Sequence, residues 1–253
     1  MLELKNISAG YGRKTVLEGV SAAFEKGKLT SIIGVNGCGK STLLKAIIGI
    51  LPLSNGEILV DETNLQAMSR NEIARRIAYL AQGKNTPDMT VEQMVLHGRF
   101  PYLSYPRRYK EADRELAKKA MDAVGIAHLA DKSMDTLSGG MRQNAYIAMA
   151  LAQDTEYILL DEPTTYLDVG HQLELMQLLK ELIHTGRGII TVTHDLPLAF
   201  RFSDRIAVLK DGAVEAFDTP EKIFASSKTE EIFHVTMGKS EEGIYYVHEI
   251  ERR

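Results

Sequence analysis

The fold of this 253-residue chain is decided by the stretch Gly34-Val35-Asn36-Gly37-Cys38-Gly39-Lys40-Ser41-Thr42. Before it lies the apolar and β-branched run 29–33, which is typical of a buried strand. After it, residues 40–50 have helical apolar spacing that stops before Pro52. A strand, then Gly-x-x-x-x-Gly-Lys-Ser, then a helix is a phosphate-binding P-loop in the context that the motif requires. The stretch therefore predicts a nucleotide site.

The residue types of this loop fit the chemistry of ATP. Glycines let the backbone wrap around phosphate with amide groups pointing inward, and the helix N-terminus adds unpaired N–H groups and a favourable dipole. We expect Lys40 to reach the β- and γ-phosphates, the Ser41 hydroxyl to bind Mg²⁺, and Thr42 to contact the α-phosphate side. Cys38 is interpreted as a small residue that fills space. The loop alone does not choose among transporters, kinases and GTPases.

Two acids end a second predicted strand. Asp161 and Glu162 follow the apolar residues 157–160, and a parallel strand presents its C-terminal end to the ligand crevice. Asp161 is expected to hold Mg²⁺ through water, and Glu162 to polarise the water that attacks the phosphate. A pair of solvated acids is the alternative, and the upstream P-loop disfavours it.

Composition excludes several classes of protein. Hydrophobic residues at 44% and charged residues at 25% are ordinary for a globular chain. The formal net charge of -4 argues against non-specific nucleic-acid binding. One cysteine excludes an intrachain disulfide and fits a reducing compartment. Neither a signal peptide nor an apolar run long enough to span a bilayer is predicted, so we expect a cytoplasmic chain whose membrane role depends on a partner.

Strands and helices alternate along the chain except in its middle. The predicted strands before the middle are 2–7, 16–24, 29–33, 58–60 and 77–81, with a turn at Asn55-Gly56. Helical patterns dominate from 90 to 153, beginning with a capping box of Thr90 and Gln93. Alternation then returns with strands 157–160 and 188–193, helices 172–184 and 195–202, and a hairpin over 206–217. Such alternation predicts an α/β fold with a mainly parallel sheet covered on both faces.

A third motif, Leu137-Ser138-Gly139-Gly140, lies just before a predicted helix and upstream of Asp161. With the P-loop and the two acids in this order, the chain resembles the ATP-binding-cassette (ABC) ATPases over nearly its whole length. The resemblance implies a P-loop NTPase core with an N-terminal antiparallel β subdomain and an inserted α-helical subdomain. It divides a single cassette, 1–253, into a core at 1–84 and 154–253 and a helical subdomain at 85–153.

The resemblance also implies a composite site. Ser138 and the amides of Gly139 and Gly140 would form a second anion site at a helix start. In the family, this site closes over the γ-phosphate held by the P-loop of a second copy, in a head-to-tail dimer. Met141, Asn144 and Tyr166 depart from the residues that many relatives carry near this seam, and Val35 replaces a frequent proline in the P-loop.

Four further residues acquire roles only through the resemblance. Tyr11 matches the aromatic residue that stacks on adenine. Gln82 matches the glutamine that touches Mg²⁺ and the lytic water. Asp168 matches an acid at the dimer seam, and His194 a histidine that contacts the γ-phosphate.

The middle of the chain suggests a cargo class. Residues 96–102, Leu-His-Gly-Arg-Phe-Pro-Tyr, resemble an element of importers for iron siderophores, haem and cobalamin. We interpret the element around Arg99 as a docking surface for a short cytoplasmic helix of a permease; a plain surface loop is the alternative. The implied partners are polytopic permease subunits and, indirectly, a substrate-binding protein, which places the chain peripherally on the cytoplasmic face of the cell membrane.

Two other functions are weighed against transport. A soluble ABC ATPase of DNA repair or translation typically carries two cassettes or a long coiled coil, whereas this chain has a single P-loop and no heptad run. A small-molecule P-loop kinase gives no reason for the motif at 137–140 or for His194. ATP hydrolysis coupled to transport is therefore the favoured function.

Overall fold

The computed structural model describes residues 1–82, 86–240 and 243–247, and two sheets form its body. The larger sheet has the strand order β10-β9-β3-β8-β7-β6. Its strands are β3 (Leu29–Ile33), β6 (Ile77–Leu80), β7 (Tyr157–Asp161), β8 (Gly188–Val192), β9 (Arg205–Lys210) and β10 (Ala213–Asp218). All neighbours are parallel except β9 and β10, which form the predicted hairpin. The central strands β3, β7 and β8 are buried along their whole length, which explains their continuous apolar runs.

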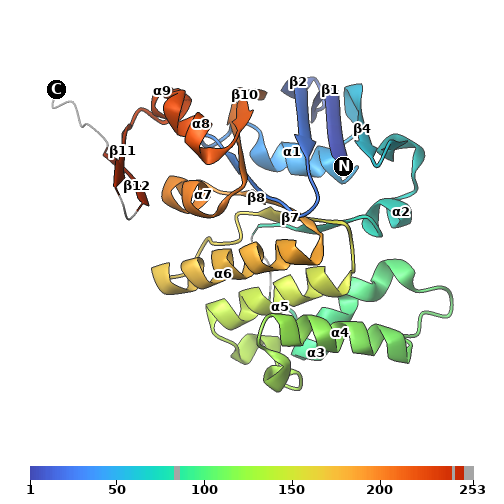
Figure 1. Ribbon diagram of the computed structural model, residues 1–253. Helices are drawn as coiled ribbons and strands as arrows, with labels where there is room; N and C mark the ends of the chain where they lie inside the picture. Colours follow the sequence, from blue (N-terminus) through green and yellow to red (C-terminus); the bar gives the residue numbers. More distant parts are fainter. Residues whose placement is uncertain (83–85, 241–242, 248–253) are drawn as a thin grey trace.

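A second, antiparallel sheet lies on one face of the large sheet. It consists of β1 (Leu2–Tyr11), β2 (Lys14–Phe24), β4 (Leu53–Val60) and β5 (Thr63–Asn64), in the order β2-β1-β4-β5. Figure 1 shows this sheet and α1 (Lys40–Ile47) on one side of the large sheet, with α5 (Gly139–Ala152) and α6 (Val169–Leu182) on the other. The predicted α/β P-loop fold with an antiparallel β part is confirmed.

The predicted turn at Asn55-Gly56 is wrong. Both residues lie inside β4, where the pairing with β1 shifts register between Lys5 and Ser8. Gly56 has φ 81°, and Asn6 in β1 has φ 51°, so the glycine serves an irregularity in a continuing strand. A Cβ at position 56 would also clash with the backbone carbonyls of β1. The same conformational freedom that suits a turn is used here for a bulge.

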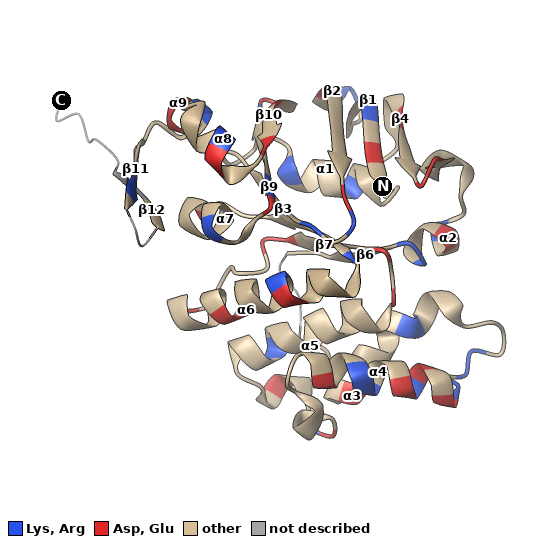
Figure 2. Cartoon of the chain, in the orientation of Figure 1, with Lys and Arg blue, Asp and Glu red and all other residues tan. Residues whose placement is uncertain are grey.

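The middle of the chain is helical, as predicted. It contains α3 (Val91–Leu96), a 3₁₀ segment (His97–Tyr102), α4 (Glu111–Ala123) and α5. The capping box of Thr90 and Gln93 is present at the start of α3. These helices share one apolar core with α6 and one face of the large sheet, and α1 and the antiparallel sheet fill the core on the other face. Figure 2 shows acidic and basic residues interspersed along α4, as in a solvated helix face.

Several elements complete the chain. They are α2 (Arg70–Ala74), α7 (Leu196–Phe202), α8 (Pro220–Ala225), α9 (Lys228–Phe233) and the hairpin β11 (Thr236–Ser240)–β12 (Gly243–Val247). The expected boundary between 84 and 85 falls outside the described residues. In the ranges that the structure describes, no helix combines the length and the apolar character needed to cross a bilayer.

Candidate active site

The P-loop connects β3 to α1, and the backbone geometry requires glycine at two of its positions. Gly39 caps α1 with φ 107°, a conformation that L side chains rarely adopt. A Cβ on Gly34 would clash with the carbonyl oxygen of Leu209 in β9 and with Cys38 Sγ. Cys38 is 4% exposed and belongs to the apolar core, as its space-filling interpretation predicts, and burial raises the pKa of its thiol. A buried thiol with a raised pKa is a poor nucleophile.

The Lys40 side chain folds back into the loop. The residue is 6% exposed, and its Nζ donates hydrogen bonds to the carbonyl oxygens of Gly34 at 2.7 Å and Val35 at 3.1 Å. The ammonium group therefore lies inside the backbone ring of the P-loop, where phosphate oxygens would compete with these carbonyls for it. Thr42 is buried on the same first turn of α1.

Asp161 joins the P-loop to the end of β7. It is 5% exposed, and its Oδ1 accepts a hydrogen bond from Ser41 Oγ at 3.1 Å. Its Oδ2 accepts a second from the Tyr79 hydroxyl at 3.2 Å. Burial raises the pKa of Asp161, although both hydrogen bonds act to lower it. The pKa of Tyr79 is also raised, first by burial and then by the nearby charge of Asp161, so the phenol keeps its proton.

Mg²⁺ suits the oxygen donors at this point. A hydroxyl and a carboxylate lie side by side, and the described part of the chain holds no cluster of three or more His, Cys, Asp or Glu that could bind a metal by itself. Mg²⁺ commonly takes one or two protein oxygens and completes its shell with phosphate and water. Ser41 and Asp161 fit that pattern.

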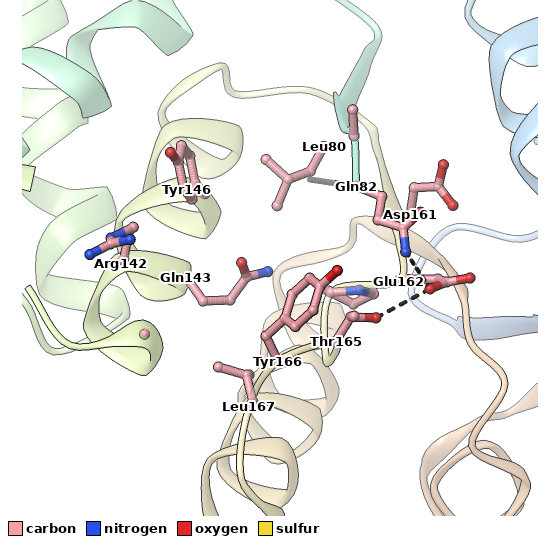
Figure 3. Close-up of a pocket in the computed structure, with 13 residues that line it drawn as sticks. Leu80, Gln82, Arg142, Gln143, Tyr146, Asp161, Glu162, Thr165, Tyr166 and Leu167 are labelled. Carbon is pink, nitrogen blue, oxygen red and sulfur yellow. Dashed lines mark hydrogen bonds between the residues drawn. The ribbon is translucent and has the colours of Figure 1, made fainter. Parts of the chain in front are cut away.

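Glu162 follows Asp161 in an unusual backbone conformation. Its φ is 51°, in the left-handed region, and its side chain is 15% exposed. Its Oε2 accepts hydrogen bonds from Gln82 Nε2 at 2.6 Å and Thr165 Oγ1 at 3.2 Å, and His194 Nδ1 lies 3.7 Å away. Figure 3 shows the hydrogen bonds from Gln82 and Thr165 meeting at this carboxylate. Backbone strain at a fixed carboxylate is a feature of functional sites.

A cavity of about 450 Å³ opens beside these groups. It lies between the ends of β6 and β7 and the first turns of α5, and Gln82, Asp161, Glu162 and Gly139 all line it. The fold therefore brings Ser41 against Asp161, and Gln82 and His194 against Glu162, which follows Asp161 directly in the chain. Lys40 lies in the same loop as Ser41 and binds the carbonyls of that loop. Gly139 faces open space on its Cβ side.

Other sequence-predicted residues lie away from this network. Tyr11 is 50% exposed at the end of β1. Ser138 caps α5 by accepting a hydrogen bond from Met141 N at 3.3 Å, and Asp168 caps α6 and pairs with His171 at 2.7 Å. In the ranges that the structure describes, Ser138, Gly140 and Asp168 make no hydrogen bond to the P-loop.

Two contacts were missed at the sequence level. Tyr79 stands in a predicted strand three residues before Gln82, and Thr165 follows Glu162 by three residues. Neither has a motif of its own, because each matters only through a side chain that the fold brings against the acids.

Arg99, in the element expected to dock a permease helix, is itself buried and does not lie on that surface. Arg99 is 7% exposed; its Nε donates to Asp113 Oδ1 at 3.0 Å and its Nη1 to the Ala152 carbonyl at 2.9 Å. Its guanidinium also lies 3.9 Å from the centre of the Tyr102 ring. Arg99 therefore ties the 3₁₀ segment to α4 and α5, while Phe100 remains 44% exposed.

The fold and this site define a P-loop nucleoside triphosphatase. Comparison with known families gives a match to the ABC transporter family over residues 17–165, more than half of the chain. The chain is 43% identical over 231 residues to the ferric enterobactin transport ATP-binding protein FepC of Escherichia coli (strain K12), a match covering 90% of this chain and 85% of FepC. It is 42% identical over 236 residues to the petrobactin import ATP-binding protein FpuD of Bacillus anthracis, covering 92% and 86%.

A solved structure agrees with these relatives. The dimeric structure of MJ0796, a bacterial ABC transporter cassette, superimposes with a TM-score of 0.73 and 30% identity, over 87% of this chain and 99% of that one. The chain therefore belongs to the ABC transporter family, as an ATP-binding subunit with ATPase activity. Transport is thus favoured over DNA repair or translation.

Proposed function

We propose that this chain hydrolyses ATP to drive an importer of metal chelates, of the iron-siderophore, haem or cobalamin type. The catalytic part is carried by one observation, the Glu162 carboxylate held by Gln82 beside the pair of Asp161 and Ser41. The cargo class is supported by the names of the relatives, which transport ferric enterobactin and import petrobactin.

Each polar group has a proposed task. Glu162 orients water and accepts its proton, and Gln82 fixes that carboxylate. Lys40 exchanges its two carbonyl contacts for phosphate oxygens, and His194, whose side chain is 58% exposed, reaches the γ-phosphate. Mg²⁺ bound by Ser41, Asp161 and Gln82 would neutralise charge on the phosphates.

A second copy of the chain is proposed to complete each site. Ser138 stands at the start of α5 with the open Gly139 beside it, and a helix start with free amides attracts anions. Gly140 and Asp168 line the same seam, and Tyr11 is exposed for stacking on adenine. The dimeric structure of the related cassette MJ0796 supports the pairing of two copies; their head-to-tail arrangement is part of the proposal.

A groove next to α2 is the proposed permease site. It has a volume of about 470 Å³ and lies between the end of α1, α2, the 3₁₀ segment and α5. Ile50, 63% exposed, and Phe100 give it an apolar rim, which suits an amphipathic helix. We propose that a short cytoplasmic helix of a polytopic permease binds here, which holds the chain on the cytoplasmic face of the membrane.

The groove lies where two parts of the cassette meet. We propose that residues 85–153 form the helical subdomain and 1–84 with 154–253 the core, because α3, α4 and α5 pack mainly on one another. A helix bound in the groove touches both parts, so its movement would change how Ser138 is presented to the second copy.

Transport by reconstituted complexes tests this proposal. The chain, its co-purifying permease and binding protein are placed in proteoliposomes, and uptake of a ferric siderophore, haem and cobalamin is compared. We expect ATP-dependent uptake of an iron chelate that Glu162→Gln abolishes. A chain that purifies with nucleic acid or ribosomes, and with no membrane subunit, would instead support the soluble ATPase. Phosphate transfer to a small-molecule acceptor would support a kinase.

A further inference from the structure

Tyr79 borders both the permease groove and the ATP site. It is the third residue of β6 and is half-buried. Its side chain lines the groove of about 470 Å³, and its hydroxyl donates to Asp161 Oδ2 at 3.2 Å. Among the described residues that line the groove, only Tyr79 makes a side-chain hydrogen bond to a residue of the candidate site. The Tyr79 side chain thus connects the permease groove with the ATP site.

The Tyr79 hydroxyl donates to Asp161 Oδ2, an oxygen that accepts no other hydrogen bond from the described residues. Asp161 is buried, and Ser41 from α1 holds its Oδ1, while Tyr79 from β6 holds its Oδ2. With both oxygens held, the plane of the carboxylate is fixed. Removing the phenol would leave Oδ2 free to rotate away, and a metal ligand that must first be ordered binds less tightly.

The tyrosine side chain is suited to transmit a displacement. Its ring is rigid, so pressure that turns the side chain about the Cα–Cβ bond moves the hydroxyl as well. Ile77 and Met149 line the same groove as Tyr79, so a helix seated there would lie against all three residues. The side chains of Ile77 and Met149 carry no polar group that could bind Asp161.

We propose that Tyr79 is a positioning residue that couples occupancy of the groove to the orientation of Asp161, and so to the binding of Mg²⁺ with ATP. The proposal rests on the proposed function, which supplies the partner in the groove. It assigns two separable parts to one residue. The ring contacts the permease helix, and the hydroxyl holds the metal-binding carboxylate.

Tyr79→Phe separates these two parts, because it keeps the ring and removes the hydroxyl. The matched control is Tyr105→Phe, which removes the hydroxyl of a tyrosine that is 97% exposed and lies outside both sites. Binding of a non-hydrolysable ATP analogue to the purified chain is measured by calorimetry, with Mg²⁺ and with a chelator. The metal-free Kd also reports whether each variant is folded.

For Tyr79→Phe we expect the Mg²⁺-dependent gain in affinity to fall about tenfold, as for the loss of a hydrogen bond to a charged group, with the metal-free Kd unchanged. In complex with the permease, we expect Tyr79→Phe to co-purify as the wild type does and to lose stimulation of its ATPase. Tyr105→Phe should keep the metal effect and the stimulation.

Two results would overturn the inference in different ways. If Tyr79→Phe kept the wild-type gain in affinity from Mg²⁺ and the wild-type stimulation of its ATPase, Tyr79 would only fill space. The proposed ATPase function would be unaffected. A wild-type chain whose affinity for the analogue does not depend on Mg²⁺ would remove the proposed function and the inference together.

Discussion

The two halves of the proposed composite site differ in how firmly the chain holds them. On the P-loop half, Lys40 and Asp161 are nearly inaccessible, and each is held by at least two hydrogen bonds. The other half, called here the signature half, consists of the motif 137–140 and the residues near the seam, where Tyr166 is 92% exposed and Met141 44% exposed. The difference fits the proposal that one chain fixes the groups that carry out chemistry and presents outward the groups that close the site of a second copy.

The largest effect is expected at the fixed half. Glu162→Gln removes the proposed base but keeps the shape of the side chain, so ATP hydrolysis should fall by about 100-fold or more, in the range that general-base catalysis contributes. ATP binding should persist and dimers should accumulate, because hydrolysis no longer reopens them. Phosphate release and light scattering measure the two effects. Glu181→Gln, on the exposed face of α6, is the control. Normal hydrolysis by Glu162→Gln would remove this residue from its role.

Mixing two inactive chains tests whether the halves come from different copies. Lys40→Ala damages the P-loop half, and Ser138→Glu places a negative charge in the signature half. Each alone should be inactive as a dimer. The mixture should recover about a quarter of wild-type activity, because half of randomly formed dimers are mixed and each has one intact site. Recovery is read from phosphate release on titrating one chain with the other, and a mixture that stays inactive would contradict composite sites.

Arg99 extends the comparison to stability. Its pair with Asp113 is buried on both sides, so Arg99→Ala should lower the free energy of unfolding by about 3–5 kcal/mol. The exposed pair of Arg114 and Glu92 is the matched control, and Arg114→Ala should cost less than about 1 kcal/mol. Urea unfolding measures both. If the two variants lowered the free energy of unfolding equally, Arg99 would behave as a surface residue.

A smaller effect is expected where the first turn of α5 touches α6. A Cβ on Gly140 would lie 2.6 Å from Cδ2 of His171, so Gly140→Ala should destabilise the fold by about 1–3 kcal/mol through overpacking. Adding His171→Ala removes the obstacle and should recover most of that loss. Thermal unfolding of the two single variants and the double variant forms a double-mutant cycle. Additive effects would show that the two residues do not press on each other.

The sequence alone was sufficient for the strand, loop and helix around Lys40, because those signals are local and agree with one another. It was insufficient at Gly56, where pairing with β1 overrides a local turn signal. It was also insufficient at Arg99, whose burial depends on Asp113 and Ala152, residues 14 and 53 positions away. α8, α9 and the terminal hairpin were not predicted, since they carry no motif.

The same distinction applies to the candidate site. Residues with a motif could be identified by spacing, and the resemblance supplied Gln82 and His194. Tyr79 and Thr165 could not be found, because their importance is a matter of which atoms they touch in space. Motifs identify residues that a family shares, whereas only the structure identifies the residues that hold them in place.

The left-handed backbone at Glu162 has a consequence for how this protein responds to selection. A non-glycine residue in that conformation costs about 1 kcal/mol or more, and the chain bears that cost where its proposed base stands. Glycine would relieve it and would also end hydrolysis. Directed evolution for heat resistance alone should therefore tolerate or enrich replacements at position 162, whereas evolution for iron-limited growth should keep the glutamate and accept the lower melting temperature.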